Sequence, residues 1–161
     1  MTFLIVLICV VVAVLLLKPA IKKALAIWYA AAIALALLYV GVLQGLLPLS
    51  APARNVLFLL LQKGTLAVAL FTVVMFVGVF RRDSKLRKYL SPIRAELSII
   101  ACLLIIGHIL AYCLTYVPRV LGAGVITPFV SVGLGVALAV TVLLVVLGAT
   151  SFNNVKVRMS S

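Results

Sequence analysis

Acidic side chains are almost absent from this chain. Its 161 residues include only two Asp or Glu, Asp83 and Glu96, beside fourteen Lys or Arg. Two acids close together in the sequence cannot form a proton relay across a bilayer, so a proton pump is disfavoured. HExxH, GxSxG and P-loop motifs are also missing, and Gly122-Ala123-Gly124 lacks the strand–turn–helix context of a dinucleotide site. We therefore expect no flavin or NAD module in the chain.

Cysteine and histidine are scarce as well. Cys9, Cys102 and Cys113 all fall in apolar runs, which disfavours a disulfide framework and favours small apolar packing roles. The single histidine, His108, stands in the middle of the apolar run 95–117. An ionisable side chain is costly to place inside a membrane, and imidazole is a preferred ligand of metals and haem iron. His108 is therefore the first functional candidate.

The chain is rich in apolar sequence, with 67% hydrophobic residues and a mean hydropathy of +1.43. Its runs are long enough to approach or cross a hydrocarbon core of about 30 Å, and they predict one all-α, polytopic transmembrane domain over residues 1–161. The first run is short, but it lacks the basic start and small-residue cleavage site of a signal peptide, so we take it as a span. The five predicted spans are residues 2–17, 24–47, 55–80, 95–117 and 130–150.

Basic residues are divided unevenly between the two sides that these spans define. Three of them, Arg54, Lys63 and Arg119, fall on one side and eleven on the other. The positive-inside rule then places the N-terminus outside and the C-terminus inside a membrane, and we expect the bacterial cytoplasmic membrane. Anionic headgroups of the bilayer account for the net charge of +12 without a nucleic-acid partner. The eleven are Lys18, Lys22, Lys23, Arg81, Arg82, Lys85, Arg87, Lys88, Arg94, Lys156 and Arg158.

Polar side chains gather in the outer half of the predicted bundle. Lys63 lies about 12 Å along its helix from Asn55, and His108 about 13 Å from Val117, so the two are expected at similar depth. Tyr112 follows His108 by four residues and shares its helix face. Such a layer suits a cofactor or substrate site open to the external compartment. The other polar members of the layer are Gln44, Gln62, Thr65 and Tyr116.

Each of these residues also has a plainer interpretation. Lys63 can extend along its helix to reach water, and Tyr116 can belong to the aromatic belt at the membrane interface. His108 can bridge two helices by a hydrogen bond to a backbone carbonyl. Glu96 suits the start of its helix, where it can pair with Arg94.

Three segments of the chain carry patterns of a known superfamily: residues 94–112, 63–70 and 147–152. They resemble the ferric-reductase-like transmembrane domains, which include the haem subunit of the periplasmic methionine-sulfoxide reductase system. Residues 94–101 (RAELSIIA) followed by 107–112 (GHILAY) are similar to the haem-bearing helix of that superfamily, with a basic start, an aliphatic run, and a His followed by an aromatic residue. Residues 63–70 (KGTLAVAL) resemble the preceding helix. Residues 147–152 (LGATSF) resemble the inner end of the next one.

The resemblance implies that His108 is an axial ligand of haem b, with Tyr112 beside it. Lys63 and Arg119 would pair with the haem propionates, and electrons would pass from the cytoplasmic side to an external acceptor. In the superfamily a second helix supplies another histidine, but the predicted span 130–150 has none, and the family pattern continues into a further helix after residue 152. A second copy of the chain, a partner membrane or redox subunit, or a ligand other than histidine would complete the iron site.

Two other functions stay open at this point. The chain can be a non-catalytic structural or assembly subunit of a larger membrane complex, with His108 as a bridging donor. It can also be a small transporter with a site at His108 and Lys63, although the sequence shows no signal for a broken helix or an inverted repeat. Whether the chain is part of an enzyme is undecided; it would then be the transmembrane haem subunit of an oxidoreductase.

Overall fold

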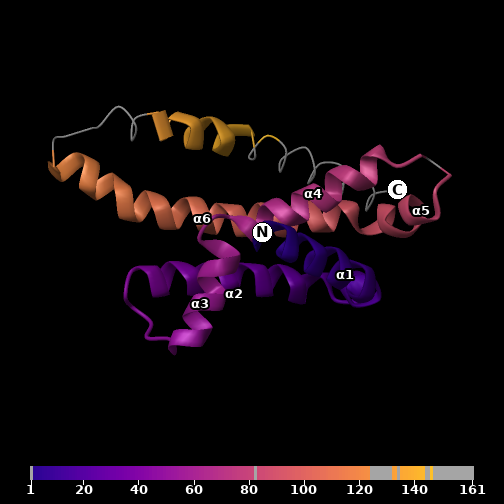
Figure 1. The fold of residues 1–161 in the computed structure, drawn as a ribbon, viewed down its shortest axis with the longest axis horizontal. Helices are drawn as coiled ribbons and strands as arrows, with labels where there is room; N and C mark the ends of the chain where they lie inside the picture. The colour runs from indigo at the N-terminus through magenta and orange to yellow at the C-terminus, as the bar shows by residue number, and fades with distance from the viewer. Residues whose placement is uncertain (1, 82, 124–131, 134, 144–145, 147–161) are drawn as a thin grey trace.

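The computed structural model describes residues 2–81, 83–123, 132–133, 135–143 and 146, and within these residues the chain is helical without strands (Figure 1). Residues 135–143, inside the predicted span 130–150, are helical, and the rest of that span lies largely outside the described residues. The predicted all-α fold is therefore confirmed. The elements are α1 (Thr2–Lys23), α2 (Leu25–Leu43), α3 (Ala51–Leu61), α4 (Thr65–Val79), α5 (Lys85–Leu90), the 3₁₀ turn η1 (Ser91–Ile93) and α6 (Arg94–Ala123).

Three helical stretches in the described part are long and apolar enough to cross a membrane: α1, α2 and Lys85–Pro118. The pair α3 and α4 would make a fourth span, bent by 41° at the break between them. Large apolar side chains on α1 are exposed, among them Leu4, Ile8 and Leu16, which is 71% exposed. Such a surface is unfavourable in water and compatible with a protein embedded in a bilayer.

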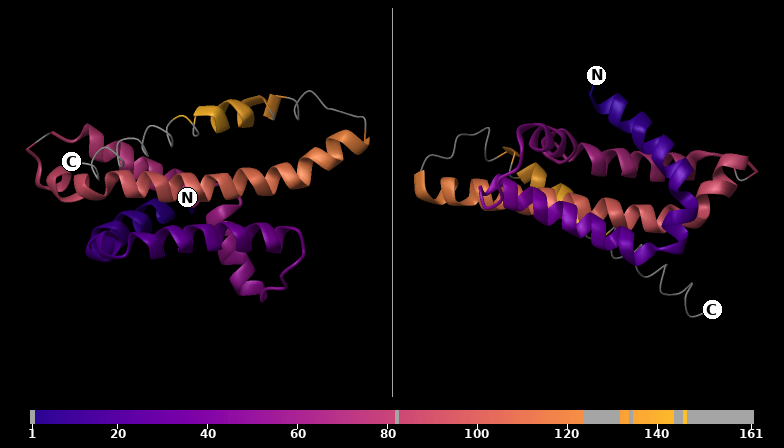
Figure 2. Two further views of the ribbon diagram at one scale, coloured as in Figure 1. Left: turned by 180° about the vertical axis from the view of Figure 1, so that it is seen from behind. Right: turned by 90° about the horizontal axis from the view of Figure 1, so that it is seen from below.

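Helix α6 lies at the centre of the described bundle. It packs along α2 on one side and α4 on another, while α1 packs mainly on α4 (Figure 2). Gly107 of α6 permits the closest approach, because a Cβ at this position would overlap the Cβ of Ala36 on α2. Ala69 and Ala101 are also fully buried. Small residues let helix backbones approach closely in membranes, where packing rather than water expulsion drives association.

Helix α1 extends beyond its predicted end at Leu17 and passes through Pro19 to Lys23. Proline has no N–H, so the carbonyl of Leu15 loses its usual helical donor. The hydroxyl of Tyr89 on α5 donates to this carbonyl at 3.2 Å. Because the freed acceptor has a new donor, the helix continues where the sequence indicated a break.

The predicted span 55–80 is two helices rather than one. Helix α3 ends at Leu61 and α4 begins at Thr65, with Gly64 between them at a φ of +62°. A positive φ ends the α-helical hydrogen-bond pattern, and glycine adopts it without steric cost. The polar residues near Lys63 therefore surround a helix break inside the predicted span.

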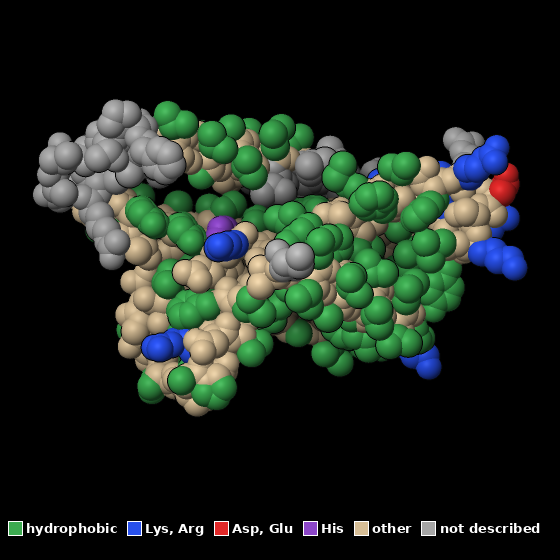
Figure 3. Space-filling model, viewed as in Figure 1, with side chains coloured by type: hydrophobic (Ala, Val, Ile, Leu, Met, Phe, Trp, Pro, Cys, Tyr) green, Lys and Arg blue, Asp and Glu red, His purple; other side chains and the backbone are tan. Residues whose placement is uncertain are grey.

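The basic segment 81–94 was expected to be a hydrophilic connection, and it contains α5 and η1. Ser84 caps α5 by accepting a hydrogen bond from the Arg87 backbone at 3.1 Å, and Arg87 donates to the Phe80 carbonyl at 2.7 Å. The ammonium of Lys18 lies 3.5 Å from the centre of the Tyr89 ring. Figure 3 shows basic side chains gathered over this end of the molecule, beyond the apolar body.

Candidate functional site

The break between α3 and α4 exposes backbone carbonyls that α3 cannot satisfy by itself. The carbonyl oxygen of Leu61 accepts a hydrogen bond from the backbone N–H of Gly64 at 3.0 Å. It accepts a second from Nδ1 of His108 on α6 at 2.8 Å. A carbonyl left without donors inside a membrane is costly, so these contacts stabilise the break.

The partner of Nδ1 determines the form of the His108 ring. A carbonyl oxygen can only accept, so Nδ1 must carry the proton, and in a neutral imidazole Nε2 then keeps its lone pair. Histidines that bind metals are commonly oriented in this way, with one nitrogen donating to a backbone carbonyl and the other free to coordinate. The site therefore provides one oriented nitrogen ligand.

Tyr112 forms the second contact between α6 and the break. Its hydroxyl donates to the Gln62 carbonyl at 3.0 Å, and its ring centre lies 4.7 Å from that of His108. On its other side Tyr112 stacks on Tyr116, with ring centres 5.5 Å apart and planes 4° from parallel. One face of α6 thus carries the rings of His108, Tyr112 and Tyr116. The first two donate hydrogen bonds to neighbouring carbonyls at the α3–α4 break.

Gly64 fits closely against this face. A Cβ at Gly64 would lie 3.0 Å from Cδ1 of Ile105 and 3.8 Å from Cδ2 of His108. Two features therefore favour glycine here: its backbone has a positive φ, and side chains of α6 occupy the space that a Cβ would need. Sequence reasoning missed this role, because a single glycine within an apolar run is tolerated inside a continuous helix.

Lys63 lies inside the break, between Gln62 and Gly64, and its side chain is exposed. Gln62 accepts a hydrogen bond from Tyr112, and Gly64 lies near the His108 ring. Because these two residues flank Lys63, the backbone of Lys63 is at the level of the imidazole. Arg119 belongs to α6, eleven positions beyond His108 or about 16 Å along the helix. The side chain of Arg119 lies outside the described residues.

Tyr39 is a further polar residue of this region that sequence reasoning missed. It is 1% exposed, on α2, and meets the Phe58 ring of α3 edge-on with centres 6.0 Å apart. Its buried hydroxyl has no hydrogen-bond partner among the described residues. Within an apolar span a tyrosine resembles any other core aromatic, so the sequence did not distinguish it.

The remaining ionisable candidates do not extend the site. Oε2 of Glu96 is buried without a hydrogen-bond partner in the described part of the chain, while the Arg94 guanidinium lies over Gly78 of α4. The cysteines at 9, 102 and 113 are free. No group of three His, Cys, Asp or Glu that would hold a metal ion is found among the described residues.

A similar protein occurs in Treponema pallidum (strain Nichols), where it is described only as uncharacterized. It is 35% identical over 105 residues, which are 63% of this chain and 28% of that protein. The chain thus matches less than a third of the length of this relative. No family model matches the chain, and no solved structure does.

Proposed function

We propose that this chain is a membrane-embedded electron-transfer subunit that binds haem b through Nε2 of His108. The observation that carries the proposal is the 2.8 Å contact between Nδ1 of His108 and the Leu61 carbonyl, which orients the ring so that Nε2 would be the nitrogen that binds the iron. The resemblance of residues 94–112 to the haem-bearing helix of ferric-reductase-like domains supports the same residue. Haem b supplies a one-electron redox centre whose potential depends on its ligands and on burial.

The described residues would supply one axial ligand of a haem iron. The imidazole is fixed by a hydrogen bond from Nδ1 to the Leu61 carbonyl, and in its neutral form it would offer Nε2 to the iron. Tyr112 packs on the ring and limits its rotation. Lys63 and Arg119 would provide cations for the propionates. The second axial ligand would come from another copy of the chain or from a partner subunit.

The proposal includes a topology of five spans with the N-terminus outside and the C-terminus inside the bacterial cytoplasmic membrane. The distribution of basic residues supports it. In this arrangement the break at residues 62–64 lies toward the outer side, and the chain would pass electrons from the cytoplasmic side to an external acceptor.

A structural or assembly subunit is the second candidate. It is favoured by the same hydrogen bonds, because His108 and Tyr112 already have a complete role in satisfying the carbonyls of Leu61 and Gln62. In that case the imidazole would link α6 to the α3–α4 break, and Nε2 would bind nothing.

Optical spectra of the protein purified from cells supplied with haem separate the two candidates. We expect a Soret band that shifts and sharpens on reduction. His108→Gln can still donate to the Leu61 carbonyl through its amide, so it should preserve the fold and lose the band. Tyr112→Phe removes the other hydrogen bond and should keep the band. A His108→Gln variant with the wild-type spectrum would refute the assignment and favour the structural role.

A further inference from the structure

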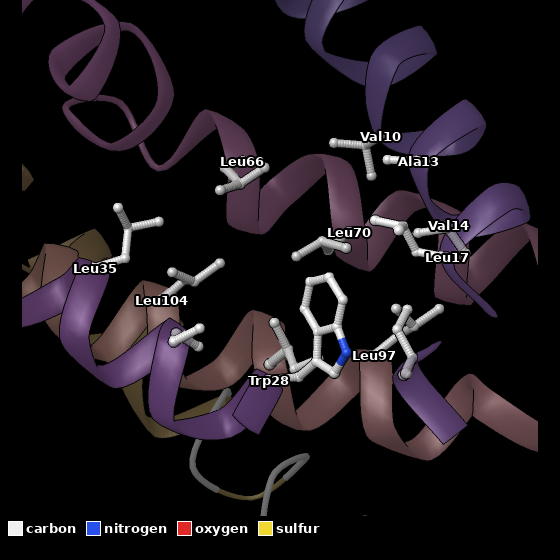
Figure 4. A pocket seen from close by; sticks show the side chains of 14 residues that line it. Val10, Ala13, Val14, Leu17, Trp28, Leu35, Leu66, Leu70, Leu97 and Leu104 are labelled. Carbon is white, nitrogen blue, oxygen red and sulfur yellow. The ribbon is translucent and has the colours of Figure 1, made fainter. Parts of the chain in front are cut away.

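A cavity of about 230 Å³ lies between α1, α2, α4 and α6. Every residue that lines it is Ala, Val, Leu or Ile, except Trp28 of α2. Figure 4 shows the indole of Trp28 projecting among these aliphatic side chains. The wall thus offers an apolar surface with a single side-chain hydrogen-bond donor, the indole N–H. This chemistry suits a hydrocarbon chain that carries a carbonyl near one end.

The cavity reaches the surface at residues of α1 and α2. Ala13 of α1 and Ala31 of α2 line it and are themselves exposed, and neighbouring surface residues such as Leu16 and Ile27 are apolar and largely exposed. A ligand that enters between these helices therefore comes from an apolar surface. In a protein whose helices are suited to a bilayer, that surface is covered by lipid chains.

Two lysines follow the cavity residue Ile21 in the sequence. Lys22 and Lys23 lie in the last turn of α1, at its junction with α2, between the cavity residues Ile21 and Trp28. Both lysines are exposed, and the chain has no Asp or Glu between residues 2 and 81. The cations of this turn thus have no acidic partner within the helices that carry them, and an anion is the complementary ligand.

We propose that the cavity binds one anionic phospholipid, with an acyl chain among its aliphatic residues and its phosphate group at Lys22 and Lys23. The ester carbonyl of the chain would accept a hydrogen bond from Nε1 of Trp28. The lipid would fill the space where α1 diverges from α2 and would link the two helices. This inference is independent of the haem assignment, because neither His108 and Tyr112 nor their hydrogen-bond partners line the cavity.

Trp28 is the only tryptophan of the chain, so its fluorescence reports on this cavity directly. The protein is reconstituted in phosphatidylcholine vesicles that contain a minor fraction of lipid with brominated acyl chains, which quench nearby indoles. Brominated phosphatidylglycerol should quench Trp28 more strongly than the same fraction of brominated phosphatidylcholine. Equal quenching by the two lipids would show that the indole meets only bulk lipid and would overturn the proposal.

Two pairs of variants test the parts of the site separately. The double variant Lys22→Gln/Lys23→Gln should reduce the preference for phosphatidylglycerol by about tenfold, whereas Lys85→Gln/Lys88→Gln on α5 should not. Ala31→Phe fills the mouth of the cavity and should abolish the preference, whereas Ala30→Phe, an exposed neighbour outside the cavity lining, should keep it.

Native mass spectra of the wild type mixed with both lipids should show one phosphatidylglycerol retained. An unchanged preference in both test variants would overturn the assignment.

Discussion

The hydroxyl of Tyr89 donates a hydrogen bond to the carbonyl of Leu15, 74 positions earlier in the chain, at 3.2 Å. This carbonyl is the acceptor that Pro19 leaves without a donor in α1. A side chain of the basic segment thus replaces a missing hydrogen bond in the first helix. The relationship explains why α1 continues through a proline.

Tyr89→Phe should lower the free energy of unfolding by about 1 kcal/mol, because it removes this hydrogen bond. The variant keeps the aromatic ring that the Lys18 ammonium contacts. The effect should shrink in a Pro19→Ala background, where the alanine N–H can supply the helical hydrogen bond instead. Thermal unfolding in detergent of the four proteins of this double-mutant cycle measures the coupling. Equal losses in both backgrounds would mean that the tyrosine does not act on the carbonyl freed by Pro19.

Gly64→Ala should destabilise the protein by roughly 1–2 kcal/mol from the left-handed backbone conformation alone, with a further cost from contact with Ile105. Gly45 also has a positive φ, of +74°, but a Cβ there would meet no atom within 4 Å. Gly45→Ala is therefore the matched control for backbone strain without crowding. Thermal melts should place Gly64→Ala below Gly45→Ala, and the reverse order would contradict the close packing of the break against α6.

Lys63→Met should weaken haem binding or shift the reduction potential more than Arg54→Met does. Lys63 lies in the break at the level of His108, whereas Arg54 lies in the first turn of α3. A cation near the propionates stabilises their charge, and a distant exposed cation is screened. Redox titration of the Soret band measures both effects. Equal changes in the two variants would mean that Lys63 only reaches toward water.

A single cysteine introduced at Ser84 should react with a membrane-impermeant reagent only from the cytoplasmic side. Ser84 lies in the basic segment that the positive-inside rule places inside. Labelling of intact cells and of inverted vesicles, in a background without the three native cysteines, checks the orientation. Reaction in intact cells would reverse the proposed topology.

Apolar run length was sufficient to predict an all-helical chain and the approximate positions of α1, α2 and α6. It could not predict where helices continue or break within a run. Pro19 indicated an end to α1, but a hydroxyl distant in the sequence satisfies the carbonyl that it frees. Lys63 and Gly64 appeared to belong to a continuous span, because a glycine gives no sign of its φ until its neighbours are placed.

His108 and Tyr112 could be singled out from the sequence, but their contacts could not. His108 and Tyr112 were identified because polar groups in apolar helices are costly and therefore informative. Their acceptors, the carbonyls of Leu61 and Gln62, are backbone atoms that every residue has. The sequence therefore does not indicate which of them a helix break will expose. Tyr39 was missed because its side chain has the character of an ordinary core aromatic.

The carbonyl oxygen of Leu61 receives donors from two directions, the Gly64 backbone and the His108 ring. The same oxygen therefore stabilises the bend between α3 and α4 and orients the imidazole. A change in the angle between α3 and α4 would therefore rotate the imidazole. A pull on Nε2 would in turn be transmitted to the helix break. The bend between α3 and α4 is thus mechanically linked to the orientation of the histidine.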